Sequence, residues 1–133
     1  MTTIFTRIIE GQIPGTFVYR DDQCVAFLSI NPLATGHVLV VPIEEVDHWI
    51  DMSPELSAHM FAVSHRISRA ISDAFPSTRV GLIIAGYEIN HCHIHLIPTH
   101  TMEQLNFANA APNIDRVTLE SHAQLLTQAL ARI

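Results

Sequence analysis

The sequence has few charged residues and no long apolar segment, and each shortage excludes a class of protein. Only 15% of its 133 residues are charged and 48% are hydrophobic, which is enough to bury a core. The longest apolar runs are far shorter than the roughly 20 residues that cross a bilayer, so no membrane association is expected. The amino terminus also lacks the blocks of a signal peptide, which predicts a cytoplasmic protein.

Basic residues and cysteines are scarce as well. Seven Lys plus Arg against 13 Asp plus Glu give a formal net charge of −6. Because affinity for nucleic acid rests largely on basic contacts, a nucleic-acid partner is not expected, whereas a small phosphate ester needs only a few donors. The two cysteines, Cys24 and Cys92, fit a reducing compartment with unpaired buried thiols, and a disulfide between them is the alternative.

The chain contains no repeat or linker and is expected to form one domain over residues 1–133. Apolar spacing and turn residues predict a short helix, three strands, a long helix, two strands and a final helix. Ser53-Pro54 is typical of a helix start, and Pro76 must end that long helix. The other expected elements cover residues 4–10, 17–20, 24–30, 37–42, 79–85, 91–97 and 119–131. Without repeated strand-helix-strand crossovers, this order predicts an α+β fold with a mainly antiparallel five-stranded sheet.

Nine histidines are the unusual feature of the composition, and three of them alternate between residues 91 and 95. Successive side chains of a strand point to opposite faces. His91, His93 and His95 therefore share one face, while Cys92 and Ile94 point toward the core. The plainest interpretation is a solvated polar face, although threonine or charged residues would serve that purpose better.

Two functional interpretations compete with the plain one. Imidazole is a common zinc ligand, but the Cα atoms of His91 and His95 would lie roughly 13 Å apart in a strand. A metal would then need His37 or a carboxylate, and no HExxH or Cys-x-x-Cys motif is present. Alternatively, a neutral imidazole attacks phosphorus while its neighbours donate hydrogen bonds. The chemistry favours this metal-free, cofactor-free catalysis.

The stretch at residues 91–97, His-Cys-His-Ile-His-Leu-Ile, resembles the signature of the histidine triad (HIT) family. Residues 4–14 and 25–42 resemble the family as well, so the similarity covers about 4–98 and leaves a divergent tail. The resemblance implies a homodimer whose sheets join. It also implies a hydrolase or transferase that cleaves a phosphoramidate or phosphoanhydride bond of a nucleotide-like substrate through a nucleotidyl-histidine intermediate.

Four histidines match active-site positions of the family. His93 matches the nucleophile, and His95 matches the residue that contacts the phosphate and assists the leaving group. His91 matches the residue that orients the nucleophile. His37 matches a fourth active-site histidine from a neighbouring strand.

The sequence also departs from the family pattern. Thr3 and Thr6 stand where some relatives carry a zinc-binding cysteine pair, so that zinc site is not expected. Ser29 replaces an acidic residue that often holds the ribose hydroxyls, and the loop before the triad is shortened at residues 83–86. The expected substrate contacts are Ser29, Ile30, Asn31, Tyr87 and Glu88.

The carboxylate of Glu88 would repel a phosphate unless it points away. Together with Ser29, Tyr87 and the shortened loop, this motivates an alternative function, a nucleotide-binding or sensing module with weak catalysis. His100 is expected near the mouth of the substrate site, and Glu45 on a solvated face. The remaining histidines are expected at the surface without a ligand role: His48, His59, His65 and His122.

Overall fold

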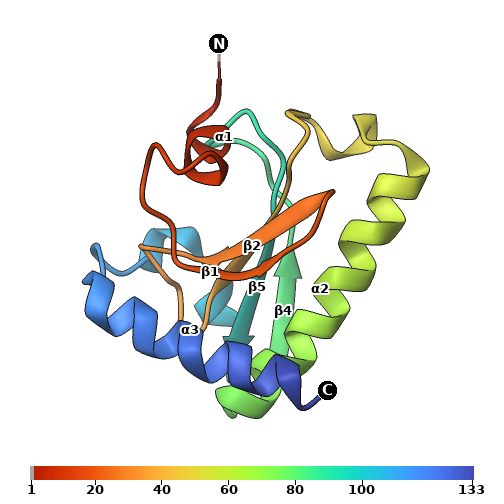
Figure 1. Cartoon of the computed structure of the whole chain (residues 1–133). Coiled ribbons are helices and arrows are strands. Elements are labelled where there is room, and N and C mark those ends of the chain that lie inside the picture. Colours follow the sequence, from red (N-terminus) through yellow and green to blue (C-terminus); the bar gives the residue numbers. More distant parts are fainter. Residues whose placement is uncertain (1) are drawn as a thin grey trace.

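A computed structural model describes residues 2–133; Met1, which the predicted domain includes, lies outside them (Figure 1). The structure confirms the predicted α+β class and the order of the elements. The helices and strands are α1 (Ile4–Ile9), β1 (Phe17–Arg20), β2 (Cys24–Leu28), β3 (Val38–Pro42), α2 (Pro54–Ala74), β4 (Arg79–Ile83), β5 (Ile94–Thr99) and α3 (Arg116–Ala131). Short 3-10 helices cover Trp49–Asp51, Met102–Leu105 and Phe107–Asn109.

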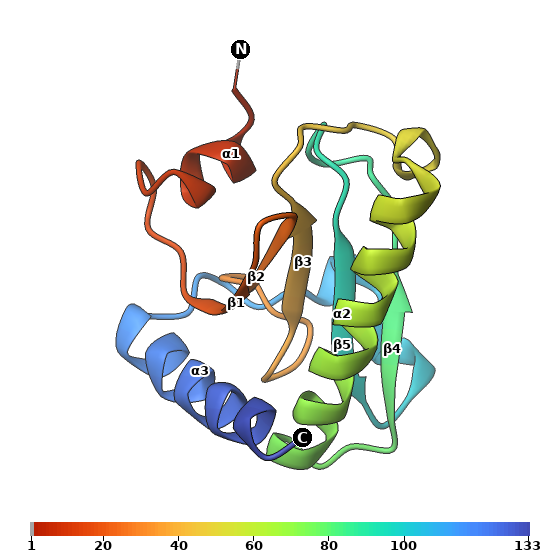
Figure 2. The ribbon, with the colours of Figure 1, turned by 45° about the vertical axis from the view of Figure 1, so that its right-hand side comes forward.

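The five strands form one antiparallel sheet in the order β1-β2-β3-β5-β4. After β3 the chain passes through α2 to the edge strand β4 and returns in β5, which therefore lies beside β3 (Figure 2). In this central pair Leu39 is opposite His95. The strand that carries the last triad histidine is thus held on both sides by other strands.

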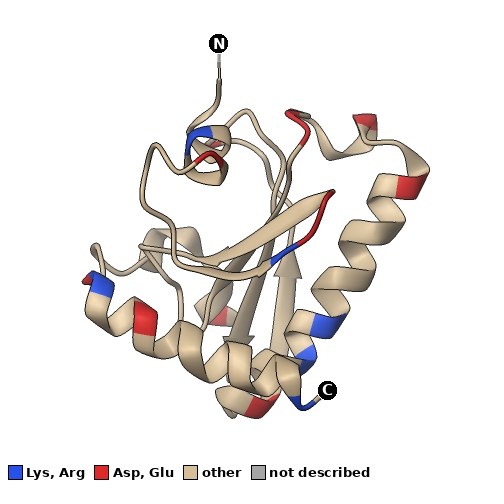
Figure 3. Ribbon diagram, in the orientation of Figure 1, with Lys and Arg blue, Asp and Glu red and all other residues tan. Residues whose placement is uncertain are grey.

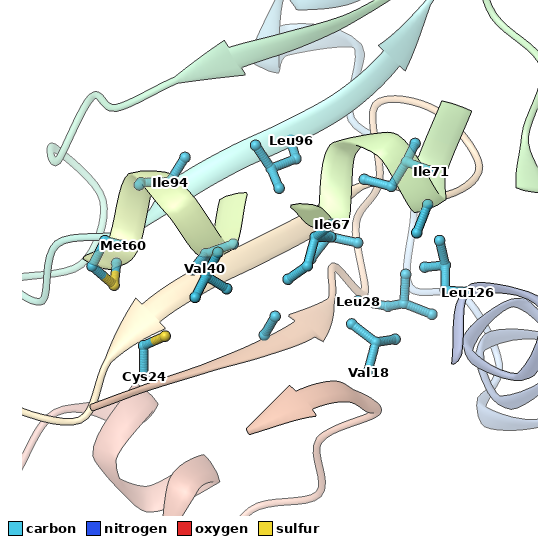
Figure 4. Packing of buried hydrophobic residues seen from close by; sticks show 14 of the residues in the cluster. Val18, Cys24, Leu28, Val40, Met60, Ile67, Ile71, Ile94, Leu96 and Leu126 are labelled. Atoms are coloured by element: carbon cyan, nitrogen blue, oxygen red, sulfur yellow. The ribbon is translucent and has the colours of Figure 1, made fainter. Parts of the chain in front are cut away.

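Helix α2 packs the main core against one face of the sheet. Its side chains Met60, Ile67 and Ile71 meet Val40 and Leu96 of the central strands (Figure 4). Ser53 caps the helix as predicted, because its Oγ accepts a hydrogen bond from the Leu56 amide at 3.1 Å. Helix α3 contributes to the same core and contacts both α2 and β1.

The opposite face of the sheet has a smaller apolar cluster of Phe5, Val25, Phe27, Leu39 and Val41. Phe5 reaches it from α1, the short amino-terminal helix. Charged residues lie on loops, strand ends and helix surfaces, away from the central strands (Figure 3). No helix in residues 2–133 combines the length and apolarity that a bilayer crossing requires.

Several predicted boundaries were wrong by a few residues. The strand predicted at 91–97 begins at Ile94, since the backbone before it bonds to loops instead of a neighbouring strand. The Cys92 amide, for example, donates to the Val46 carbonyl at 2.7 Å. Strand β4 ends at Ile83 instead of residue 85. Helix α3 begins three residues earlier than predicted, because the Asp115 carboxylate caps it.

Candidate active site

A cleft of about 560 Å³ opens on the sheet face opposite α2, and its lining contains His37, His93 and His95. Of the predicted substrate contacts, the four that line it are Ser29, Ile30, Asn31 and Glu88. Tyr87 does not line the cleft: it is 94% exposed, beside a turn at Gly86 whose φ is +86°. Gly86 permits this backbone bend because it has no Cβ. The prediction of Tyr87 as a contact is therefore not supported.

His91 is fully buried and both of its ring nitrogens are engaged. Nε2 lies 2.7 Å from the Pro42 carbonyl oxygen, and Nδ1 lies 2.7 Å from Oγ1 of Thr3. A carbonyl oxygen only accepts, so Nε2 carries the proton and, in a neutral ring, Nδ1 accepts from the threonine hydroxyl. His91 consequently has no free nitrogen for a substrate, and it is not part of the cleft lining.

His93 has the opposite arrangement, with one nitrogen bound and one free. Its Nδ1 lies 2.8 Å from the backbone carbonyl of His91, so Nδ1 carries the proton and Nε2 a lone pair. Among the described residues Nε2 has no hydrogen-bond partner, yet it is not sealed from solvent. His93 lines the cleft, and Nε2 is its ring nitrogen left free for a ligand there.

A hydrogen bond from His37 determines which nitrogen of His95 carries the proton. The Leu33 amide donates to Nδ1 of His37 at 3.1 Å, so the proton of a neutral His37 is on Nε2. That Nε2 lies 3.0 Å from Nδ1 of His95 and donates to it. The proton of His95 is then on Nε2, the nitrogen without a partner in residues 2–133, and it is available to a ligand in the cleft.

Burial keeps these rings neutral. Desolvation, together with the neighbouring His93, lowers the pKa of His37 to about 4. Burial, together with His93 and His37, lowers the pKa of His95 to about 3. Burial also lowers the pKa of His93, although the His91 carbonyl and the Glu88 carboxylate act in the opposite direction. At neutral pH the cleft therefore presents a lone pair on His93 beside an N–H on His95.

Aromatic rings fix the positions of the two imidazoles. Phe5 packs edge-on against His93 with a centroid distance of 4.9 Å, and His93 and His95 are 4.8 Å apart. Phe107 lies 4.8 Å from His95 on its other side. Phe107 belongs to the divergent tail, and the sequence has no local signal that would place it against a residue in β5.

The tail forms one wall of the cleft. The Asn31 side chain donates to the Ala111 carbonyl at 3.1 Å and to Oδ1 of Asn113 at 2.7 Å. The Ile114 amide bonds to the Ile30 carbonyl at 2.9 Å. Asn31 therefore fastens the tail across the cleft in addition to lining it.

Two expectations about other histidines change. His100 pairs with the Thr78 hydroxyl at 3.2 Å and lines a separate hollow of about 340 Å³, so it is not at the mouth of the cleft. His59, expected at the surface without a partner, lies 2.7 Å from a carboxylate oxygen of Asp21. Cys24 completes the one His/Cys/Asp/Glu group in the described chain with ligand atoms within 4.8 Å of one another.

Hydrogen bonds within the chain account for this Asp21 cluster without an ion. Tyr19 donates to Oδ2 at 2.7 Å, and the amides of Gln23 and Cys24 both donate to Oδ1 at 2.8 Å. Asp21 therefore closes the turn between β1 and β2. The Cys24 thiol is buried, which raises its pKa to about 12 and disfavours the thiolate that a metal requires. Cys24 and Cys92 are both buried and free.

Comparisons with known proteins agree with this geometry. A model of the HIT domain matches residues 10–102. The chain is 34% identical over 102 residues to Protein hit of Bacillus subtilis, covering 73% of this chain and 70% of that protein. It is 31% identical over 134 residues to a protein named adenylylsulfatase HINT3 of Arabidopsis thaliana, covering 97% and 68%.

Two solved structures are similar over nearly the whole chain. A HIT-like protein of Bartonella henselae, involved in cell-cycle regulation, superimposes with a TM-score of 0.86 and 26% identity, covering 96% of each chain. A zinc-bound histidine triad family protein of Mycobacterium smegmatis gives a TM-score of 0.84 and 30% identity, covering 99% of this chain and 95% of that one.

Proposed function

Because the chain belongs to the HIT domain family, we propose that it hydrolyses or transfers a nucleotide-like substrate through a nucleotidyl-His93 intermediate. The substrate bond is a phosphoramidate or a phosphoanhydride. The observation that carries this proposal is the pair of opposite tautomers, a lone pair on Nε2 of His93 beside an N–H on Nε2 of His95. A nucleophile and a hydrogen-bond donor are the two groups that displacement at phosphorus needs.

In the first step the lone pair of His93 attacks phosphorus and the bond to the leaving group breaks with its electron pair. The N–H of His95 donates a hydrogen bond to the departing atom. An oxyacid leaves as its anion; an amine also needs a proton, which His95 supplies after the bound phosphate's charge favours its protonation. Water then attacks the same phosphorus, the P–N bond breaks, its electrons return to His93 and the displaced proton passes to solvent.

The cleft walls support a nucleoside as the group that carries this phosphorus. Apolar side chains dominate the lining, which suits a flat base. Among its polar residues, Ser29 is bonded to the backbone of His37 and Glu88 acts on His93. We assign Ser29, Ile30 and Asn31 to contacts with the substrate. The Arabidopsis relative's name, adenylylsulfatase, is compatible with a nucleotide joined to an oxyacid.

We also propose that two copies join into a homodimer through β4 in the reducing cytoplasm. Within residues 2–133 no strand pairs with the outer edge of β4, whereas α3 contacts β1 at the other edge. An edge with free backbone groups is a template for pairing with a second sheet. Sedimentation equilibrium would test the assembly, and a monomer at micromolar concentration would refute it.

Intact-protein mass spectrometry tests the chemical proposal directly. Wild type and His93→Gln are mixed briefly with an adenosine 5′-phosphoramidate or adenosine 5′-phosphosulfate. An added nucleotidyl mass on wild type alone is the expected result. Turnover that persists in His93→Gln would refute the intermediate.

A second candidate is a nucleotide-binding module with weak catalysis. It is favoured by Glu88, whose carboxylate lines the cleft where a phosphate would approach His93. Calorimetric binding of adenosine monophosphate without turnover of either class of substrate would support it over the enzyme.

A further inference from the structure

The amino-terminal segment, residues 2–9, is bonded to the triad through Thr3. The Thr3 amide donates to a carboxylate oxygen of Glu45 at 2.9 Å; Glu45 is exposed, as expected, and has this contact in addition. The Thr3 hydroxyl lies 2.7 Å from Nδ1 of His91 and also accepts from the Thr6 amide at 3.1 Å. One side chain thus caps α1 and holds a buried imidazole.

The hydroxyl gives His91 a single stable orientation. The one N–H of the neutral ring, at Nε2, donates a hydrogen bond to the Pro42 carbonyl, which leaves a buried lone pair on Nδ1. Within the described chain Thr3 is the donor that reaches this lone pair. Without that donor the ring would have an unsatisfied acceptor, and it would relieve this by rotating or by taking up a second proton.

The orientation of His91 matters because its own backbone carbonyl binds His93. The Nδ1–H of His93 donates a hydrogen bond to this carbonyl at 2.8 Å, and that bond leaves Nε2 of His93 free for the cleft. The other end of the same His91–Cys92 peptide group is also held, because the Cys92 amide donates to the Val46 carbonyl. A shift of the His91 ring would move this peptide group and weaken its hydrogen bond to His93. The proton of His93 would then no longer be held on Nδ1.

Phe5 extends the same segment to His93. Its ring packs edge-on against both His91 and His93, at centroid distances of 5.7 and 4.9 Å. Thr3 and Phe5 therefore bring the amino-terminal segment into contact with two triad histidines.

We propose that Thr3 is a positioning residue of the active site. Its hydroxyl keeps His91 in one tautomer and orientation, and the His91 carbonyl thereby keeps the lone pair of His93 directed to the cleft. This inference rests on the proposed function, since it assumes that His93 is the nucleophile.

Three substitutions separate positioning from capping. Thr3→Ser keeps the donor to His91 and the acceptor that caps α1. Thr3→Asp keeps a capping acceptor but has no hydroxyl proton for Nδ1, and its carboxylate favours a doubly protonated His91, so the neutral tautomer is lost. Thr3→Val loses both the capping acceptor and the donor. Thr2→Val is the matched control, because Thr2 is an exposed neighbour.

The expected result is a loss of kcat in the Asp and Val variants with little change in KM. Removing a group that orients an active-site histidine typically lowers activity about 10- to 100-fold. Thr3→Ser and Thr2→Val should stay within about threefold of wild type, below any effect expected from lost positioning. Thermal unfolding of each variant checks that it is folded.

A second readout does not depend on turnover. Long-range ¹H–¹⁵N correlation spectra report which nitrogen of each histidine is protonated. Wild type should show the Nδ1–H tautomer for His93, and Thr3→Val and Thr3→Asp should show a mixture.

Folded Thr3→Val with wild-type kcat and an unchanged His93 tautomer would overturn the proposal. A loss of kcat in Thr3→Ser as large as that in Thr3→Val would also overturn it, since Thr3→Ser keeps the hydroxyl donor. If wild type turns over no substrate, the proposed function fails, while the tautomer comparison still decides whether Thr3 positions His93.

Discussion

Histidines occupy two contrasting environments in this protein, and the contrast explains why only one of them suits nucleophilic chemistry. In the cleft, His37, His93 and His95 are buried and bonded to neutral groups. Between the β1–β2 turn and α2, His59 is partly exposed and pairs with the carboxylate of Asp21. A buried ring among neutral partners stays uncharged and keeps a lone pair free, whereas Nε2 of His59 is engaged by the carboxylate.

The Asp21 cluster stabilises the negative charge of one carboxylate. Burial alone would raise the pKa of Asp21, but hydrogen bonds from Tyr19, from two backbone amides and from His59 lower it overall. The same contact raises the pKa of Tyr19 to about 12. This cluster stabilises a charge, while the cleft prevents one.

Removing the neutral nucleophile should have the largest effect. His93→Ala is expected to lower kcat by at least about 10³-fold, as for the loss of a covalent nucleophile. His59→Ala is the matched control and should retain nearly full activity. Steady-state kinetics on a nucleoside phosphoramidate would show this, and comparable losses in both variants would contradict the contrast.

A carboxylate placed next to His95 should make its surroundings resemble those of His59. Phe107→Asp places an acid against the His95 ring and should raise the pKa of His95 well above about 3. Protonation of His95 would disrupt the hydrogen bond that it accepts from His37, and kcat/KM should fall about tenfold. NMR titration measures the pKa, with Phe107→Leu as the uncharged control; equal titration curves in the two variants would refute the reasoning.

Acid should destabilise the cleft. The pKa values of His37 and His95 fall from 6.5 to about 4 and about 3 on folding, so the unfolded state binds more protons as the pH decreases. The stability that these two rings contribute is complete above pH 6.5 and is lost as the pH falls toward 4 and 3. Between pH 7 and pH 5 each ring should lower the free energy of unfolding by about 1–2 kcal/mol.

Urea titrations between pH 7 and pH 5 would measure this loss. His37→Asn should reduce the pH dependence by about half, since one of the two titrating rings is removed. A free energy of unfolding that does not change over this range would show that the rings are not kept neutral by folding.

The smallest effect belongs to the structural cluster. Asp21→Asn should lower stability by about 1 kcal/mol, because the site is partly exposed and the amide retains some of the hydrogen bonds. Activity should be unchanged. A loss of kcat in this variant would mean that the two histidine environments are coupled.

The elements that depend on local patterns were predictable from the sequence. The Ser53-Pro54 start of α2 is observed, and Cys92 lies in the core as predicted, although it precedes β5. Histidines at alternate positions also sufficed to place His93 and His95 on one side of the sheet.

Contacts between residues far apart in the sequence were not predictable. Thr3 attracted notice only as the substitute for a cysteine, and its bond to His91 spans 88 residues. His59 has its partner 38 residues away. Tyr87 was expected at the substrate because of its place in the family pattern, but the turn at Gly86 directs it to solvent.

The bonds from Asn31 to residues 111 and 113 have a consequence for how the protein can diversify. The HIT domain match ends at residue 102, so the wall that Phe107, Ile114 and Arg116 contribute is outside the shared core. One wall of the cleft is therefore encoded apart from the stretch that carries the histidines and Ser29–Asn31. Mutations after residue 102 can reshape that wall while the histidines keep their positions.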